Sequence, residues 1–104
     1  MYARVNTFQG PPESIEQALK NVSENVVPSV RKISGNTGVI SLVDRATGKS
    51  IGITLWESEE ALRQSEPAAS GIRQQGADDN ASQIVSVERF EVTDFVLAGQ
   101  SAVV

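Results

Sequence analysis

Residues 49–62 read KSIGITLWESEEAL, and the fold prediction rests on the change from strand to helix within this segment. Alternating β-branched and aliphatic residues up to Trp56 predict a strand. Ser58, followed by Glu59 and Glu60, predicts a helix start, because a serine hydroxyl caps free backbone amides and acidic side chains favour the positive helix end. A large amphipathic ring at the exit of a strand often lines a cleft.

The N-terminal part of the chain predicts a strand followed by a helix. Residues 2–8 alternate in character, as is typical of a strand. Ser14 to Gln17 fits a capping box, so a helix is expected to begin at Ser14. Apolar residues then recur every three or four positions as far as Ile33. Pro28 is expected to kink this helix or to end its regular part, because proline has no amide proton.

The remainder of the chain predicts a hairpin, a second helix and a last strand. The expected ranges are a loop at 35–38, strands at 39–43 and 49–56 joined by a turn at 44–48, a helix from 58 to 65, a polar loop or frayed helix end at 74–82, and a strand at 84–92. Pro67 is expected to begin a new turn or a second helical piece that reaches Ile72. Residues 95–97 are a candidate short strand, and residues 98–104 are expected to form a flexible tail.

The element order is therefore strand, helix, strand, strand, helix, strand. It predicts a single ferredoxin-like α+β domain over residues 1–97, with a four-stranded antiparallel sheet and both helices on one face. Apolar side chains on both faces of the hairpin strands indicate that the second face of the sheet is covered as well. In a chain this short the expected cover is another copy, so we predict a homodimer packed sheet to sheet as a dimeric α+β barrel.

The composition excludes several classes of function. The 104 residues contain no cysteine and no histidine, which removes disulfides, thiolate nucleophiles, Cys/His zinc sites and Ser-His-Asp triads. The net charge is −4 and the nine basic residues are scattered, so nucleic-acid binding is not expected. The absence of a long apolar run or a leader-like start predicts no membrane segment and a cytoplasmic location. Asp78 to Asn80 lacks the spacing of a calcium loop and predicts a turn, so no metal site is expected.

Three segments of the chain resemble the antibiotic-biosynthesis monooxygenase family, which is part of the dimeric α+β barrel superfamily. They are Tyr2 to Phe8, Val26 to Arg31 and Ile53 to Leu62, and the resemblance covers roughly residues 2–92. It implies a ligand pocket between the sheet and the helices. Catalytic members of the family oxidise reduced aromatic or polyketide substrates with molecular oxygen, often without a metal or flavin. Other members degrade haem, and many have no known activity.

The resemblance also implies roles for individual residues. Asn6 matches the first-strand asparagine of the catalytic branches, and Trp56 matches the pocket tryptophan after the third strand. As catalytic residues, Asn6 would hydrogen-bond a phenolate or enolate oxygen, and Trp56 would stack on the substrate ring and donate its indole N–H. Arg4 has the same strand parity as Asn6, so its cation would support the same anion. Arg4, Phe8 and Trp56 are the expected substrate-binding residues.

The chain departs from the family pattern in two places. It lacks the helix histidine with which the haem-degrading members hold iron, which argues against haem degradation. Residues 57–70 also lack the tyrosine that anthrone-oxidising members place near their tryptophan. No residue is an obvious base, so oxygen activation would depend on the substrate itself.

Each candidate residue also has a purely structural interpretation. Asn6 would satisfy a neighbouring backbone group, Trp56 would fill the core or an interface, Arg4 would pair with a carboxylate across the sheet, and Arg89 would form an ordinary cross-strand pair. Three functions therefore remain open. They are a cofactor-independent oxygenase, a binding or accessory protein that uses the same pocket without turnover, and an interaction module whose pocket is filled by its own side chains.

Overall fold

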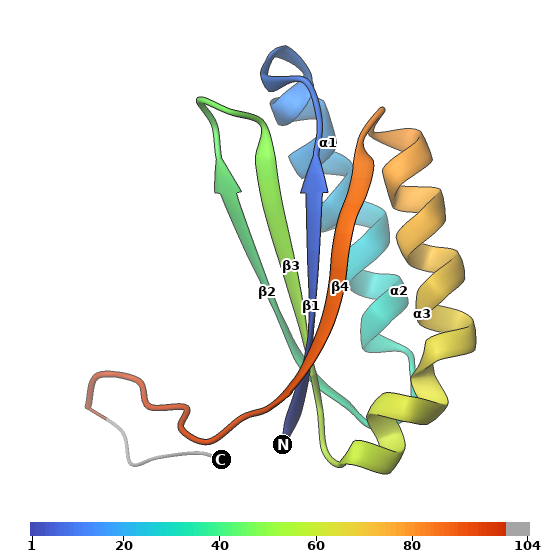
Figure 1. Cartoon of the computed structure of the whole chain (residues 1–104), viewed down its shortest axis with the longest axis vertical. Coiled ribbons are helices and arrows are strands. Elements are labelled where there is room, and N and C mark those ends of the chain that lie inside the picture. Colours follow the sequence, from blue (N-terminus) through green and yellow to red (C-terminus); the bar gives the residue numbers. More distant parts are fainter. Residues whose placement is uncertain (100–104) are drawn as a thin grey trace.

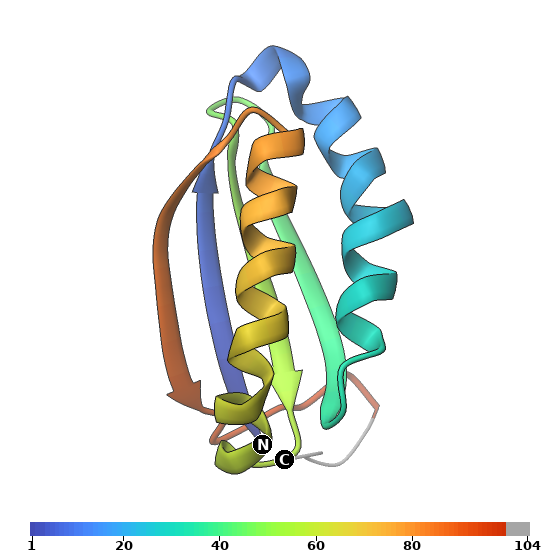
Figure 2. The same cartoon turned by 90° about the vertical axis from the view of Figure 1, so that its right-hand side faces the viewer.

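Four strands form one antiparallel sheet in the order β2-β3-β1-β4 in the computed structural model, which describes residues 1–99 (Figure 1). In chain order the elements are β1 (Tyr2–Gln9), a 3-10 turn η1 (Pro12–Ser14), α1 (Ile15–Asn21), a π-helical segment η2 (Val22–Val26), α2 (Val27–Arg31), β2 (Asn36–Asp44), β3 (Lys49–Trp56), α3 (Glu59–Asp79) and β4 (Gln83–Glu91). The helices all cover one face of the sheet (Figure 2). The ferredoxin-like α+β prediction is confirmed. Residues 100–104 of the predicted tail lie outside the described residues.

The strand register determines which side chains meet in front of the helices. β1 lies between β3 and β4, and it pairs Arg4 with Thr54 on one side and with Arg89 on the other. Asn6 is paired with Gly52 in the same way. Side chains alternate between the two faces of a strand, so Arg4 and Asn6 both project toward the helical layer. Paired residues of neighbouring strands join them there.

The first helical connection is interrupted one turn before Pro28. A π-helical segment occupies Val22–Val26, and α-helix resumes at Val27 and passes through Pro28 to Arg31. Proline cannot donate to the carbonyl four residues earlier, and its ring crowds that carbonyl. The wider π turn accommodates both effects, since it changes the hydrogen-bonding partner of the preceding backbone. The regular helix thus ends at Asn21, before the proline itself.

The capping box predicted at Ser14 is not formed. Ser14 closes the 3-10 turn η1, and its side chain makes no capping hydrogen bond within the described residues. Its backbone lies at φ −101° and ψ 5°, whereas a capping serine normally has an extended conformation. The backbone N–H of Ser14 instead donates to the Pro11 carbonyl at 3.1 Å. The local turn is therefore set by Pro11, which directly precedes it, and by Pro12, which begins it.

The loop predicted at 35–38 is shorter than expected, because β2 already begins at Asn36. Asn36 is paired with Trp56, and its Nδ2 donates to the Leu55 carbonyl at 3.0 Å. This side-chain bond ties the start of β2 to the end of β3. Ser58 caps α3 as predicted, with its Oγ accepting from the Ala61 N–H at 3.0 Å.

α3 is one continuous helix as far as Asp79, so the break predicted at Pro67 is wrong. Of the two alternatives for residues 74–82, the polar loop is wrong, and the segment contains the end of the helix. Pro67 and Arg63, the residue whose carbonyl loses its partner, are both exposed, so water can reach this side of the helix. Near the end of the helix, Gln74 donates to Asp78 at 3.0 Å and Gln75 donates to Asp79 at 2.8 Å. These i,i+4 bonds support helical structure in a polar sequence. The turn predicted at 78–80 is therefore confined to the residues after Asp79.

The additional strand predicted at 95–97 is absent from the described residues, because β4 ends at Glu91. Glu91 is paired with Tyr2, the first residue of β1, so the chain has no strand to pair with beyond this point. Val92 still donates its N–H to the Met1 carbonyl at 2.9 Å, and the chain then leaves the sheet (Figure 1). Within residues 1–99, none of the helices combines the length and the apolar character needed to cross a membrane.

Candidate functional site

A cavity of about 120 Å³ lies between the sheet and the helices. Most of its wall is apolar, and the principal apolar contributors from the helices and β2 are Leu19, Val22, Val26, Val30, Val39 and Ile72. The four residues that sequence analysis selected, Arg4, Asn6, Phe8 and Trp56, all line it as well. An apolar cavity of about 150 Å³ accommodates benzene in another protein. The space therefore suits a group of about one aromatic ring.

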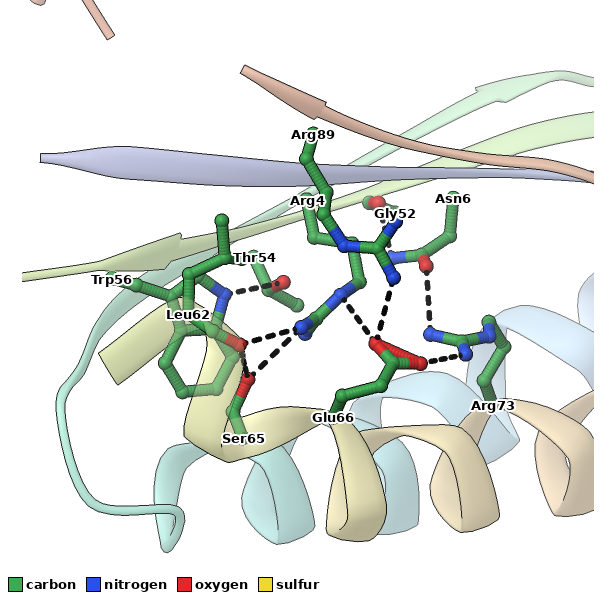
Figure 3. Close-up of polar contacts among 10 residues, drawn as sticks. All are labelled: Arg4, Asn6, Gly52, Thr54, Trp56, Leu62, Ser65, Glu66, Arg73 and Arg89. Carbon is green, nitrogen blue, oxygen red and sulfur yellow. Dashed lines mark hydrogen bonds and ion pairs between the residues drawn. The ribbon is translucent and has the colours of Figure 1, made fainter. Parts of the chain in front are cut away.

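Trp56 belongs both to the cavity wall and to the core. Its side chain is 0% exposed and packs with Val30, Ala61 and Leu62. The indole Nε1 donates to the Thr54 hydroxyl at 2.9 Å (Figure 3). Trp56 therefore borders the cavity without open surface, and a ligand would touch its ring only after a local rearrangement of the wall. The N–H that was assigned to the substrate from the sequence is bonded within the protein.

Asn6 is held on β1 by bonds at both ends of its amide (Figure 3). Its Nδ2 donates to the Gly52 carbonyl at 3.0 Å, and its Oδ1 accepts from Arg73 Nη1 at 3.4 Å. The backbone contact is the one that the structural interpretation of Asn6 expected. An amide nitrogen carries two hydrogens, so one N–H of Asn6 remains for a ligand.

Arg4 is a buried cation that reaches from the sheet to α3. The residue is 1% exposed, and its Nη2 donates to the Leu62 carbonyl at 2.8 Å and to the Ser65 hydroxyl at 3.0 Å. Its Nε lies 3.1 Å from Glu66 Oε2. The predicted carboxylate partner therefore exists, but it comes from the helix and not from across the sheet. The same correction applies to Arg89, which pairs with Glu66 and not across strands.

Glu66 is the shared partner of three arginines, as Figure 3 shows. Besides Arg4, it accepts from Arg89 Nη2 at 3.3 Å and from Arg73 Nη2. Burial pushes the pKa of Glu66 upward, but the hydrogen bond from Arg73 and the charges of Arg4 and Arg73 outweigh it, so the pKa lies below its usual value. Burial is also the main reason why the pKa of Arg4 is lowered, with Arg73 and Arg89 adding to the effect and Glu66 opposing it.

Sequence analysis missed Glu66 and Arg73. Ser65, Glu66, Ala69 and Arg73 follow one another at intervals that return to the same helix face, so a continuous helix would have placed them together. The break expected at Pro67 obscured that spacing. In the part of the chain that the structure describes, no group of three or more acidic side chains gathers into a candidate metal site.

The chain itself is similar to one family of known proteins. Residues 1–69 match the model of the antibiotic biosynthesis monooxygenase family. An uncharacterised protein of Mycobacterium tuberculosis H37Rv, Rv2558, is 36% identical over 77 residues, which are 74% of this chain and 33% of that protein. The chain thus spans about a third of the length of the curated relatives it matches.

Solved structures share the fold at low sequence identity. The monooxygenase ActVA-Orf6 of Streptomyces coelicolor, solved with nanaomycin D, aligns with a TM-score of 0.68 and 15% identity over 94% of this chain and 92% of that chain. SnoaB of Streptomyces nogalater, a cofactor-independent oxygenase, aligns with a TM-score of 0.62 and 16% identity over 91% of this chain and 95% of that chain. At these identities the likeness shows the fold alone.

Proposed function

The chain belongs to the antibiotic biosynthesis monooxygenase family, and on this premise we propose that it oxidises a small reduced aromatic or polyketide-like compound with molecular oxygen and without a bound cofactor. The observation that carries the proposal is the apolar cavity with Asn6, Arg4 and the ring of Trp56 in its wall. An aromatic body would occupy the apolar part, and an oxygen that becomes negatively charged would face the polar residues. The description of SnoaB as a cofactor-independent oxygenase agrees with this chemistry.

The proposed reaction converts an activated methylene group into a ketone. The substrate loses a proton to solvent and becomes an electron-rich anion, which transfers electrons to molecular oxygen. One oxygen atom forms the new carbonyl, and the other leaves as water with the two hydrogens of the methylene. The protein's part is to stabilise the anion through the free N–H of Asn6 and the cation of Arg4, within a largely apolar space.

A non-catalytic binding or accessory role is the second candidate. The indole N–H of Trp56 and both ends of the Asn6 amide are bonded within the protein, which leaves fewer free donors than an oxyanion site usually offers. The third possibility, a module whose pocket is filled by its own side chains, is disfavoured by the unfilled cavity of about 120 Å³. The choice therefore lies between binding with turnover and binding without it.

We further propose that the active form is a homodimer. Val5, Ile53 and Ile40 are paired across three strands, on the sheet face that points away from the helices. Leu42 and Phe90 are about half exposed on the same face. An apolar sheet face of this kind is normally covered, and a second copy of the chain offers a face of matching character.

Oxygen uptake tests the proposed function. Purified protein treated with a chelator would be mixed with anthrones, which carry an activated methylene, in air and under argon, while oxygen and product are followed. We expect uptake matched to product, and a loss of roughly 10²-fold in turnover for Asn6→Ala, because one stabilising donor is removed. Asn25→Ala is the matched control, because Asn25 is exposed on the π-helical segment η2. Saturable binding without oxygen uptake would favour the accessory role instead.

A further inference from the structure

Arg4, Arg73 and Arg89 form an arginine cluster around Glu66. Its buried side chains carry more positive than negative charge. Arg4 and Arg73 have side chains that are 1% and 12% exposed, and Glu66, 30% exposed, is the one carboxylate within ion-pair distance of either among residues 1–99. Arg89 contacts the same carboxylate but is half exposed, so water screens its charge. The enclosed part of the cluster is therefore one negative charge short. Leaving a buried charge uncompensated is costly, so the cluster favours the entry of an anion.

Arg4 also has hydrogen-bond donors that nothing within the described residues accepts. A guanidinium carries five N–H groups, and the Nη2 of Arg4 uses its two on the Leu62 carbonyl and the Ser65 hydroxyl. Its Nη1 and Nε are buried without a hydrogen-bond partner, although Nε faces Glu66 in the ion pair. Unsatisfied donors on a buried cation are rare in folded proteins. Nη1, which has no ion-pair partner either, is the donor that an incoming oxyanion would use.

Arg4 borders the cavity, but its Nη1 is itself buried, so an anion would reach this donor after a local rearrangement of the cavity wall. Arg4, Asn6 and Arg73 all contribute to that wall. Figure 3 shows Arg4 and Arg73 on the two sides of Glu66, with Asn6 above Arg73. The bond from Arg73 Nη1 to Asn6 is long, at 3.4 Å, so an anion in the cavity would compete with it readily.

We infer that the cavity ends in a carboxylate-binding subsite formed by Arg4 and Arg73, and that its ligand is a small aromatic monocarboxylic acid. The missing charge is single, which favours a monoanion over a dianion. A carboxylate matches this site because its oxygens can accept from the unpaired Nη1 of Arg4 while its charge pairs with Arg73. The ring of the acid would occupy the apolar part, whose volume of about 120 Å³ suits about one ring. This inference rests on the proposed function only in placing the ligand in the same cavity.

Benzoate and benzamide provide a direct test, because they have nearly the same shape and differ by one charge. Their binding to the full chain would be measured by calorimetry at constant ionic strength. We expect benzoate to bind roughly tenfold or more tightly than benzamide, because hydrogen bonds to charged groups are the stronger ones. Equal affinities, or no saturable benzoate binding at millimolar concentration, would overturn the inference.

Two substitutions should shift this preference in opposite directions. Arg73→Gln removes a cation and should abolish most of the preference for benzoate, whereas Glu66→Gln removes the competing carboxylate and should increase it. Arg63→Gln is the control, since Arg63 pairs with Glu59 and Glu60 on the exposed side of α3. A preference that neither Arg73→Gln nor Glu66→Gln changes would place the anion elsewhere and refute the subsite. Glu66→Gln keeps the test decisive if Arg73→Gln does not fold.

The binding assay separates this inference from the oxygenase proposal. If benzoate binding follows the expected pattern while no anthrone consumes oxygen, the carboxylate subsite stands and the oxygenase proposal fails. If a neutral anthrone is oxidised while benzoate neither binds nor inhibits, the oxygenase proposal stands and the carboxylate subsite fails.

Discussion

Arg4 and Trp56 meet at the buried side of the cavity, where the guanidinium carbon of Arg4 lies 5.6 Å from the centroid of the indole ring. This distance is within the range of a cation–π contact. The two residues come from neighbouring strands, and Thr54, the register partner of Arg4, accepts the indole N–H. The ring is thereby fixed beside the cation, so the aromatic wall and the positive charge of the cavity form one unit.

Replacing Trp56 by alanine should destabilise the fold. Its side chain is fully buried and packs with the apolar core, so Trp56→Ala is expected to lower the free energy of unfolding by about 3–5 kcal/mol. Urea denaturation followed by circular dichroism measures this change. Trp56→Phe, which keeps an aromatic ring, should cost less. An alanine variant as stable as the parent would show that Trp56 is not a core residue.

Gly52→Val should fill the cavity without damaging the sheet. Gly52 lines the cavity beside Asn6, its register partner on β1. A Cβ atom added at Gly52 meets no heavy atom within 4 Å. Valine also suits a strand better than glycine does. We expect ligand binding to be lost while the melting temperature stays the same or rises.

Gly48→Val is the contrasting control for the cavity-filling variant. Gly48 has φ +79°, and a Cβ atom there would lie 2.1 Å from the Gly10 carbonyl oxygen, so this variant should be strongly destabilised.

Retained ligand binding in a folded Gly52→Val protein would show that the ligand does not occupy this cavity.

Stability should depend on the ionisation of Glu66. The pKa of Glu66 is lower in the folded chain than its ordinary value of about 4.3. The resulting stabilisation is fully present above the unfolded pKa and is lost as pH falls through the folded pKa. The difference in unfolding free energy between the parent and Glu66→Gln should therefore shrink on acidification from pH 6 to pH 3, as successive denaturation curves would measure. A difference that is constant with pH would contradict the ion-pair cluster.

Leu42→Lys should weaken self-association more than it weakens the fold. Leu42 is 48% exposed on the sheet face that points away from the helices, so a charge there remains solvated in a single copy but is buried in a sheet-to-sheet dimer. Sedimentation analysis at micromolar concentration should show a dimer for the parent chain and a shift toward monomer for the variant. Ala68→Lys on the exposed side of α3 serves as the control. A parent chain that sediments as a monomer would refute the homodimer proposal.

Part of the candidate site was predictable because strand periodicity is local. Arg4, Asn6 and Phe8 alternate with their neighbours along β1, so their shared face follows from the sequence, and all three line one cavity. Trp56 was identified differently, as a large amphipathic ring at the exit of a strand and through its match to the family's pocket tryptophan. Their expected roles in binding and catalysis stay predictions, while their common location follows from the alternation of side chains along each strand.

The sequence by itself determined the order of strands and helices, and which β1 side chains share a face, because these properties depend on residues that are close along the chain. Only the tertiary structure decided that Arg4 meets Leu62 and Ser65, that Arg73 meets Asn6, and that Glu66 contacts three arginines. Residues in such contacts are separated by up to 67 positions. Their meeting depends on strand register, on the continuity of α3 through Pro67, and on how the helix packs on the sheet. Strand register, helix continuity and helix packing join residues that are far apart along the chain. The net charge around the cavity is therefore decided by the folded structure and not by any local sequence pattern.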